Sequence, residues 1–321
     1  MPHSPAPLSN SDVVSIEDLI AEANKVAREA IPENTKRAYR ADWRDFETFC
    51  SRRKLSSLPA RPEHVCAYLA AKSRILKRTS IRRRLTVIGI VHRMRGFQNP
   101  LEDSRVKQTW RGILRSKIES EERKAPLLLK DLRTIMEALG PDLAGIRDKA
   151  LLLLGFAGAM RRSEIVALNV SHIELQDDGL VVHLTRSKTD QLGVGRKIGI
   201  PHGENALTCP AKALLRWFEA SGISEGAIFR KVNRHGELEG NRLCGASVAL
   251  IVKRAFRLVG KRPQRFSGHS LRAGLATQAA MMGASERSIQ KQTGHKSVKT
   301  LRTYIRDGSL FLENAAKKAG L

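Results

Sequence analysis

The stretch ALLLLGFAGAMRRSEI, residues 150–165, begins with the longest apolar run of the chain. This run is followed by two arginines and a glutamate. Its apolar part is shorter than the roughly 18 residues that span a bilayer, so it predicts a buried helix. A buried arginine next to such a helix needs an anionic partner. Glu164 could hold the Arg161 guanidinium and leave its fork of donors free for a phosphate. A plain structural ion pair is the alternative, and it is the commoner explanation of an isolated R-x-x-E pattern.

The chain around this stretch is strongly basic, with 57 Lys and Arg against 32 Asp and Glu in 321 residues. The first 30 residues hold 2 basic and 5 acidic side chains, whereas residues 31–125 hold 24 and 10, and residues 126–321 hold 31 and 17. Two basic lobes suit a clamp around a polyanion. A solvated surface is the alternative, because charge favours nucleic acid but does not identify the partner.

The length suggests two domains, and the first is expected to be entirely helical. Residues 1–15 are expected to form a disordered tail, and a helical pattern starts near residue 17 and ends before Pro32. Asn34 or Thr35 can cap the next helix. Apolar residues then recur at helical spacing, which predicts helices at about 34–53, 62–76, 79–95 and 104–117. We therefore predict a helical domain over residues 16–117.

Residues 118–126 have no apolar periodicity and end in Pro126, so they predict a linker. The rest of the chain, residues 127–321, is expected to be mostly helical. The exception is residues 180–200, where LVVHLT and RKIGIP flank the basic segment RSKTDQLGVG and predict a hairpin. Further helices are predicted at about 209–220, 245–259, 269–282, 285–293 and 297–305. The expected fold class is therefore mainly α with a small β-sheet.

Two further motifs carry residues suited to phosphate chemistry. SGHSLRAG places His269 and Arg272 on one face of a helix near its amino end, which attracts anions. QTGHKSVKTLRTYIRDG places His295 nine residues before Tyr304, which lies on a separate short helix. Each motif alone is a weak signal, since most H-x-x-R pairs have no function and a lone tyrosine there would normally be part of the core.

Taken together, these residues resemble the active site of the tyrosine recombinase (phage integrase) family. Their order is arginine, a lysine in the hairpin loop (Lys188), H-x-x-R, histidine and tyrosine, and the resemblance covers roughly residues 15–312. The SGHS block and the Y-I-R ending are most similar to the Cre-like members. Cre itself resembles the minority of the family that carries tryptophan where this chain has His295, so a relative of Cre is expected.

The resemblance implies that Tyr304 attacks a DNA phosphate, forming a 3′-phosphotyrosyl bond and releasing a 5′-hydroxyl. A tyrosine with an ordinary pKa of about 10 is a poor nucleophile unless a base takes its proton or cations stabilise the phenolate. His269 would take the proton, and Lys188 would protonate the departing oxygen. Arg161, Arg272 and His295 would stabilise the charge of the transition state. No metal or other cofactor is implied, and the chain has no G-x-x-x-x-G-K-[ST] loop for ATP.

Basic residues that open two of the helices in the first domain are expected to contact DNA, and phosphate contacts are more common than base contacts. They are Lys36, Arg37, Arg40, Arg82, Arg83 and Arg84. Arg83 and Arg84 are the best candidates for reading bases.

The family resemblance also implies an assembly. A terminal apolar segment, about residues 309–319, would dock into a neighbouring copy and build a homotetramer on two duplexes that carry inverted-repeat sites. Packing of this segment against its own domain is an equally good interpretation of its pattern.

Two other functions compete with recombination. A non-catalytic DNA-binding protein explains the charge but gives no role to Tyr304. A type IB topoisomerase shares the phosphotyrosine chemistry and would relax DNA as a monomer. The amino terminus lacks a secretory signal pattern, so we expect a cytoplasmic protein without membrane contact, encoded by a bacterium or by a mobile element such as a phage, plasmid or transposon.

Overall fold

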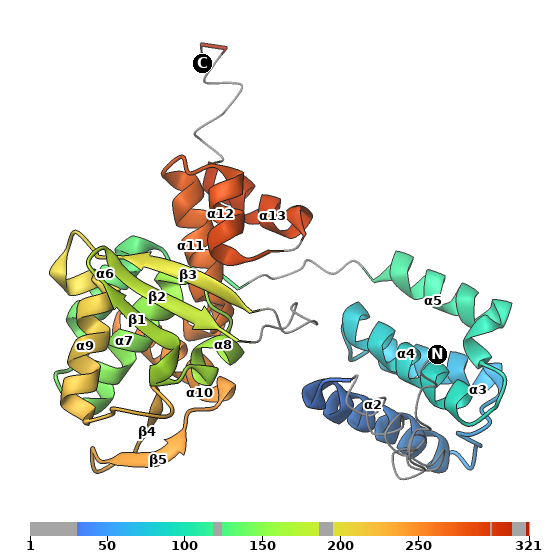
Figure 1. Cartoon of the computed structure of the whole chain (residues 1–321). Helices are drawn as coiled ribbons and strands as arrows, with labels where there is room; N and C mark the ends of the chain where they lie inside the picture. The colour runs from blue at the N-terminus through green and yellow to red at the C-terminus, as the bar shows by residue number, and fades with distance from the viewer. Residues whose placement is uncertain (1–30, 118–123, 186–194, 296, 310–318, 321) are drawn as a thin grey trace, which may run out of the picture. The chain divides into compact units, whose positions relative to one another are not determined.

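The structure is a computed structural model that describes residues 31–117, 124–185, 195–295, 297–309 and 319–320 (Figure 1). It divides into two compact units, Met1–Glu121 and Glu122–Leu321. The expected disordered tail, the helix before Pro32, Lys188 and most of the terminal segment lie outside the described residues, as does most of the expected linker. Within the described ranges, no helix has both the length and the apolar character needed to cross a membrane.

The first unit is helical, as predicted. Its elements are α2 (Glu33–Ser51), α3 (Pro62–Ser73), α4 (Arg78–Met94), a short 3-10 helix (Pro100–Glu102) and α5 (Ser104–Ser116). The predicted cap of α2 was wrong, because the helix begins directly after Pro32 and neither Asn34 nor Thr35 caps it. The Pro32 carbonyl accepts the first two helical N–H bonds, from Thr35 and Lys36. Pro32 itself occupies the N-cap position, with φ −56° and ψ 141°, and no side chain caps the helix.

Aromatic side chains from α2 and α3 form the centre of the first unit. Phe46 and Phe49 of α2 contact the ring of Tyr68 edge-on at centroid distances of 5.0 and 5.2 Å. The Tyr68 hydroxyl donates to Asp45 Oδ2 at 2.6 Å, so this buried ring keeps a partner for its polar end. Tyr68 is therefore part of the core.

The second unit is a helical domain with two small antiparallel sheets. Its helices are α6 (Leu129–Ala138), α7 (Leu143–Ala157), α8 (Arg162–Ala167), α9 (Pro210–Ser221), α10 (Gly245–Leu258), α11 (His269–Met281), α12 (Glu286–Thr293) and α13 (Val298–Ser309). Its strands are β1 (Ile173–Gln176), β2 (Gly179–Leu184), β3 (Arg196–Pro201), β4 (Arg230–Val232) and β5 (Leu238–Arg242).

The predicted hairpin is confirmed. β2 and β3 pair antiparallel, from Gly179 opposite Pro201 to Leu184 opposite Arg196. β1 adds a third strand along β2, and β4 pairs with β5 in a second sheet. The strands β1, β4 and β5 were not predicted from the sequence. In β3 the inward positions alternate, so that Ile198 and Ile200 are buried between exposed residues.

The quoted apolar run forms most of α7, the buried helix that the sequence predicts, and this helix ends at Ala157. Gly155 lets α7 approach its neighbours closely, since a Cβ there would lie 2.8 Å from Ile165 Cδ1 and 2.9 Å from Leu271 Cδ1. Ile165 belongs to α8 and Leu271 to α11. The packing of α7 therefore brings the arginine motif and the SGHS motif into one place.

The four cysteines differ in burial. Cys50 and Cys209 are buried, whereas Cys66 is half-buried and Cys244 is exposed at the start of α10. Cys244 is the N-cap residue of α10 and lies at the surface.

Replacing Gly274 of α11 by alanine should destabilise the second unit. The added Cβ would overlap the carbonyl oxygen of Leu127, whose own N–H donates to the Ser270 carbonyl on the same helix. Overpacking of this kind costs about 1–3 kcal/mol. Urea unfolding should show the loss. Gly245→Ala is the control, because its added Cβ has only Arg162 Cβ near it, at 3.8 Å. Equal stability of the two variants would contradict this account of the contact.

Candidate active site

Arg161 sits at the start of α8, where the chain turns after α7. Its backbone N–H donates to Glu164 Oε2 at 2.9 Å, and its Nη1 donates to Glu164 Oε1 at 2.5 Å. The Glu164 side chain is buried, whereas the Arg161 side chain keeps 19% of its surface exposed. Arg161 and Glu164 therefore form an ion pair that fixes the guanidinium, and the remaining donors of Arg161 have no acceptor among the described residues.

Arg272 lies one turn into α11 and is almost completely buried, with 1% of its surface exposed. Its Nη1 donates to the Ala159 carbonyl at 2.8 Å, and its Nη2 has no hydrogen-bond partner among the described residues. Burial and the nearby Arg161 charge lower the pKa of Arg272 to about 10. A buried donor without a partner marks the place where an anion would be most stabilised.

His269 and Tyr304 meet although 35 residues separate them. The His269 Nε2 and the Tyr304 hydroxyl oxygen are 2.7 Å apart, a hydrogen bond between the first residue of α11 and the middle of α13. The His295 ring is also near the tyrosine, with its centroid 6.1 Å from that of Tyr304, compared with 6.0 Å for the His269 ring. The His295 Nδ1 and the Thr293 hydroxyl form a 2.8 Å hydrogen bond that fixes the imidazole. Both histidine rings therefore lie close to the tyrosine ring.

The electrostatics of the site keep both imidazoles neutral. Burial lowers the pKa of His269, and the charges of Arg272, Arg161 and Arg162 lower it further. The pKa of His295 falls to about 3, through burial first and then through the charges of Arg272, Arg161, His269 and Arg196. A neutral imidazole at neutral pH has a free ring nitrogen that can accept a proton.

Arg196, at the start of β3, is a further half-buried cation near the site that was not among the predicted residues. Its Nη1 donates to the Gln292 carbonyl at 2.9 Å, and its Nη2 lies 3.8 Å from Glu164 Oε2. The alternation of β3 could have revealed it, since Arg196 shares the inward face with Ile198 and Ile200. Lys188, the predicted general acid, lies outside the described residues.

The structure thus brings five predicted residues to one region of the second unit through a continuous set of contacts. They are Arg161, His269, Arg272, His295 and Tyr304. No group of three His, Cys, Asp or Glu suited to holding a metal ion occurs in the part of the chain that the structure describes.

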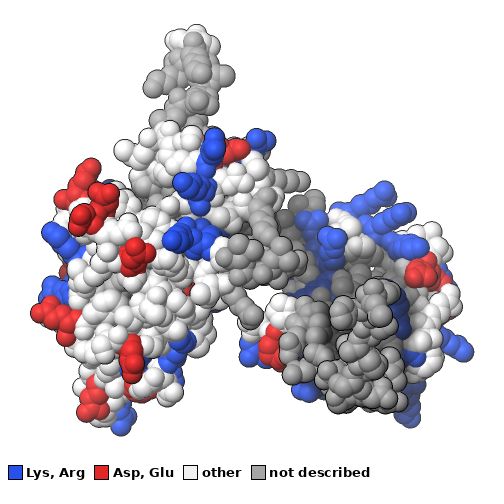
Figure 2. All heavy atoms as spheres, in the orientation of Figure 1, with Lys and Arg blue, Asp and Glu red and all other residues white. Residues whose placement is uncertain are grey.

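The basic residues predicted to contact DNA lie on α2 and α4 of the first unit. Arg37 donates to Asn34, and Arg40 and Lys36 lie 3.4 and 3.7 Å from Glu33 carboxylate oxygens, all near the start of α2. Figure 2 shows one face of the molecule, on which Lys and Arg gather over the unit with α2 to α5, whereas both signs are interspersed over the second unit.

The two predicted base readers are held by aspartates. The buried Asp42 accepts two hydrogen bonds from Arg83, whose side chain is 48% exposed. Arg84 is only 15% exposed and pairs with both Asp42 and Asp45. Arg82, by contrast, is exposed. The aspartates therefore fix the direction of both guanidiniums, and Arg84 is largely enclosed by its own unit.

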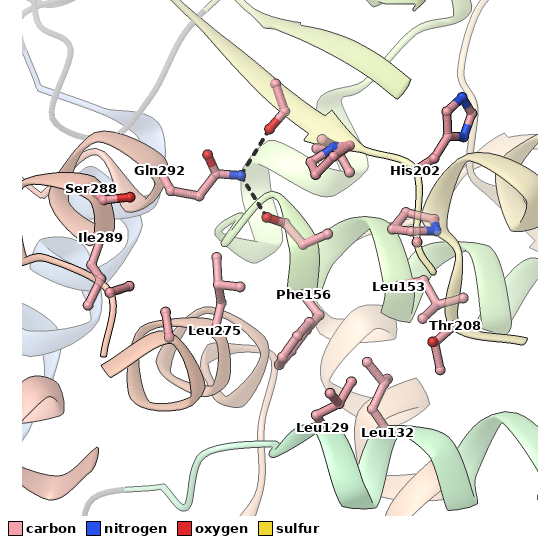
Figure 3. Close-up of a pocket in the computed structure, with 18 residues that line it drawn as sticks. Leu129, Leu132, Leu153, Phe156, His202, Thr208, Leu275, Ser288, Ile289 and Gln292 are labelled. Carbon is pink, nitrogen blue, oxygen red and sulfur yellow. Dashed lines mark hydrogen bonds between the residues drawn. The ribbon is translucent and has the colours of Figure 1, made fainter. Parts of the chain in front are cut away.

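An apolar groove of about 440 Å³ lies in the second unit among α6, α7, β3, α11 and α12 (Figure 3). Leu132, Leu153, Phe156, Leu275 and Ile289 line it. At one end, Gln292 donates from its side-chain amide to the carbonyls of Ala157 and Gly199.

Comparison with known proteins places the whole chain in one family. A model of the phage integrase family matches residues 126–309, and a model of the N-terminal SAM-like domain of phage integrases matches residues 26–94. An integrase/recombinase XerD homologue of Selenomonas ruminantium is 36% identical over 315 residues, which cover 97% of this chain and 92% of the relative. Recombinase Cre of Escherichia phage P1 is 26% identical over 302 residues, covering 87% and 86% of the two chains.

Solved structures agree on the fold. The Tn1549 transposon integrase in complex with transposon right end DNA matches with a TM-score of 0.63 at 14% identity, covering 92% of this chain and 98% of that chain. The XerH recombinase bound to its palindromic difH substrate matches with a TM-score of 0.60 at 18% identity, covering 80% and 72%.

Identity to the XerD homologue exceeds identity to Cre, so the expected Cre-like subclass is not singled out. The sequence matches over both units show that the chain belongs to the phage integrase family, the tyrosine recombinases.

Proposed function

We propose that this chain cuts and rejoins DNA at specific sites through a covalent bond between Tyr304 and a 3′-phosphate. The observation that carries the proposal is the 2.7 Å hydrogen bond between His269 Nε2 and the Tyr304 hydroxyl, next to the buried Arg272 with an unpartnered donor. This arrangement supports Tyr304 as the nucleophile, His269 as a neutral base and Arg272 as part of an anion site.

In the cleavage step, the Tyr304 oxygen would attack the phosphorus of a DNA phosphodiester while His269 Nε2 takes the hydroxyl proton. The bond from phosphorus to the tyrosine oxygen forms, and the bond from phosphorus to the 5′-oxygen breaks. We assign the proton that the 5′-oxygen gains to Lys188. Donors from Arg161, Arg272 and His295 would stabilise the negative charge on the other phosphate oxygens.

In the rejoining step, the 5′-hydroxyl of another strand would attack the phosphotyrosyl bond. His269 would return its proton to the departing Tyr304 oxygen, and the deprotonated Lys188 would take the proton of the attacking hydroxyl. The phosphotyrosyl ester keeps the energy of the phosphodiester bond, so the exchange needs no ATP. We assign Glu164 the supporting role of fixing Arg161, as their two hydrogen bonds indicate.

Recombination is favoured over relaxation of DNA by a topoisomerase and over DNA binding alone. The family match covers the helical first unit as well as the second. The similar proteins are recombinases or integrases, and this chain aligns with most of their length. A DNA-binding protein without catalysis would have no use for the contact between His269 and Tyr304.

We propose duplex DNA with an inverted-repeat site as the substrate, bound by both units. The analogy is with the similar recombinase and integrase structures, which are bound to DNA. In the first unit, Lys36, Arg37, Arg40 and Arg82 are assigned to phosphates. Arg83 keeps donors free beside Asp42 and is the better of the two candidates for a base contact, because Arg84 is mostly enclosed.

We also propose that four copies assemble on two duplexes. The segment from residue 309 to 319 contains Leu310, Phe311 and Leu312, which suit the leucine- and phenylalanine-lined groove of a neighbouring copy (Figure 3). The substrate would be bacterial or mobile-element DNA in the cytoplasm, consistent with relatives from a bacterium and a phage.

Replacing Tyr304 by phenylalanine should abolish covalent attachment to DNA and leave DNA binding intact, because only the hydroxyl is lost. The substrate is a nicked duplex built on a site that this protein enriches from a random-sequence library, and the adduct is measured on a denaturing gel. Tyr39→Phe in α2 is the control and should form the adduct at the normal rate. Adduct formation by the Tyr304→Phe variant would refute the assignment of the nucleophile.

The cleavage rate should depend on pH through His269. Because burial and three arginines lower its pKa from the ordinary 6.5, the imidazole is neutral above that pH and is protonated only as the pH falls below it. The rate should therefore be flat near neutrality and fall at acid pH. His269→Gln should lose about 10²- to 10⁴-fold in rate and lose this acid limb. A variant that keeps the same acid limb would exclude His269 as the base.

A further inference from the structure

We propose that Arg196 is a positioning residue for strand cleavage, which acts by fixing the turn that presents His295 to Tyr304. The inference rests on the proposed function and extends it to a residue outside the six catalytic residues that the motifs supply. Arg196 comes from the first position of β3, whereas His295 follows the end of α12.

The first support is the contact between Arg196 and the turn. Its Nη1 donates to the Gln292 carbonyl at 2.9 Å. Gly294 follows in the left-handed region with φ 62°, and a Cβ added there would lie 2.8 to 3.1 Å from three atoms of the Arg196 guanidinium. The glycine backbone therefore lies directly against the guanidinium, and any side chain at this position would separate them. His295 is the next residue.

The second support is that Gln292 is attached from both sides. Its main-chain carbonyl accepts from Arg196, and its side-chain amide donates to the Ala157 carbonyl at 2.8 Å and to the Gly199 carbonyl at 3.1 Å (Figure 3). Gly199 lies on the same strand as Arg196. The end of α12 is thus bound to β3 at two points, so the strand sets the position of the residues that follow.

The third support is the environment of the guanidinium itself. The Arg196 side chain is 21% exposed, and its Nη2 has no hydrogen-bond partner among the described residues. Glu164 Oε2, 3.8 Å away, attracts the charge without a hydrogen bond and is already bonded to Arg161. Leaving a buried donor of a charged group unpaired is unfavourable for stability. A role in the site explains why an arginine occupies this inward position of β3.

The test is a double-mutant cycle between Arg196→Met and His295→Gln. The measured quantity is the single-turnover rate of adduct formation at saturating concentration of the nicked duplex described above, with the Kd measured separately. Lys197→Met is the matched control, because it removes one positive charge from the neighbouring exposed position of β3. Rates are expressed relative to the wild-type chain. If the wild-type chain forms no adduct, the result contradicts the proposed function and not the role of Arg196.

We expect Arg196→Met to lower the rate about 10- to 100-fold with little change in Kd, since small misplacements of a catalytic group have effects of this size. In the His295→Gln background the same change should cost less than about threefold. Arg196→Lys, which keeps a donor for the Gln292 carbonyl, should recover part of the rate. If Arg196→Met has a lowered Tm, Arg196→Lys takes its place in the double-mutant cycle.

A second readout needs no DNA. The Cε1–Hε1 resonance of His295 in the free protein should shift in Arg196→Met and stay in place in Lys197→Met. The proposal is overturned if Arg196→Met cleaves as fast as Lys197→Met, if its loss is equally large without His295, if the whole effect lies in Kd, or if the His295 resonance does not move.

Discussion

The burial of the Arg272 guanidinium against the end of α7 is the interaction on which the rest of the site depends. α7 ends at Ala157, and the following turn, with Ala159 in the left-handed region at φ 47°, directs the Ala159 carbonyl to Arg272 Nη1 at 2.8 Å. The close packing of α7 on α11 makes this bond possible. Because the same turn continues into Arg161, two apolar helices that pack together also deliver two arginines to one place.

This packing leaves more positive than negative charge inside the second unit. Arg161, Arg196 and Arg272 surround one buried carboxylate, that of Glu164. In the absence of an anion this arrangement is unfavourable. Burial lowers the pKa of both histidines, and the charges of Arg272 and Arg161 lower it further. The same field would stabilise the charge that develops on a phosphate during transfer. The clustered arginines thus lower the local stability of the second unit but provide positive charge that is already positioned for an anion. Such an arrangement is common in active sites.

Much of the fold could be predicted because its elements follow simple patterns. The apolar run predicted α7, the β-branched segments predicted the hairpin of β2 and β3, and the order of the motifs indicated residues that the structure brings together. β4 and β5 were missed because RKV and LEGNR contain few apolar or β-branched residues. The partners of Arg83 and Arg84 were missed because Asp42 lies about forty residues away on another helix. Arg196 was missed because a single arginine on a strand matches no motif. The alternation of β3 indicates only that it faces inward, and its contact with the Gln292 carbonyl is visible only in the structure.

We propose that DNA becomes covalently bound to the Tyr304 oxygen, and mass spectrometry of the trapped complex after digestion with nuclease and trypsin would identify the bonded residue. We expect a nucleotide attached through its 3′-phosphate to the peptide Thr303–Arg306, whose tyrosine is Tyr304. A nucleotide attached to a peptide that contains Tyr39 or Tyr68, or to a serine, would show that Tyr304 is not the nucleophile.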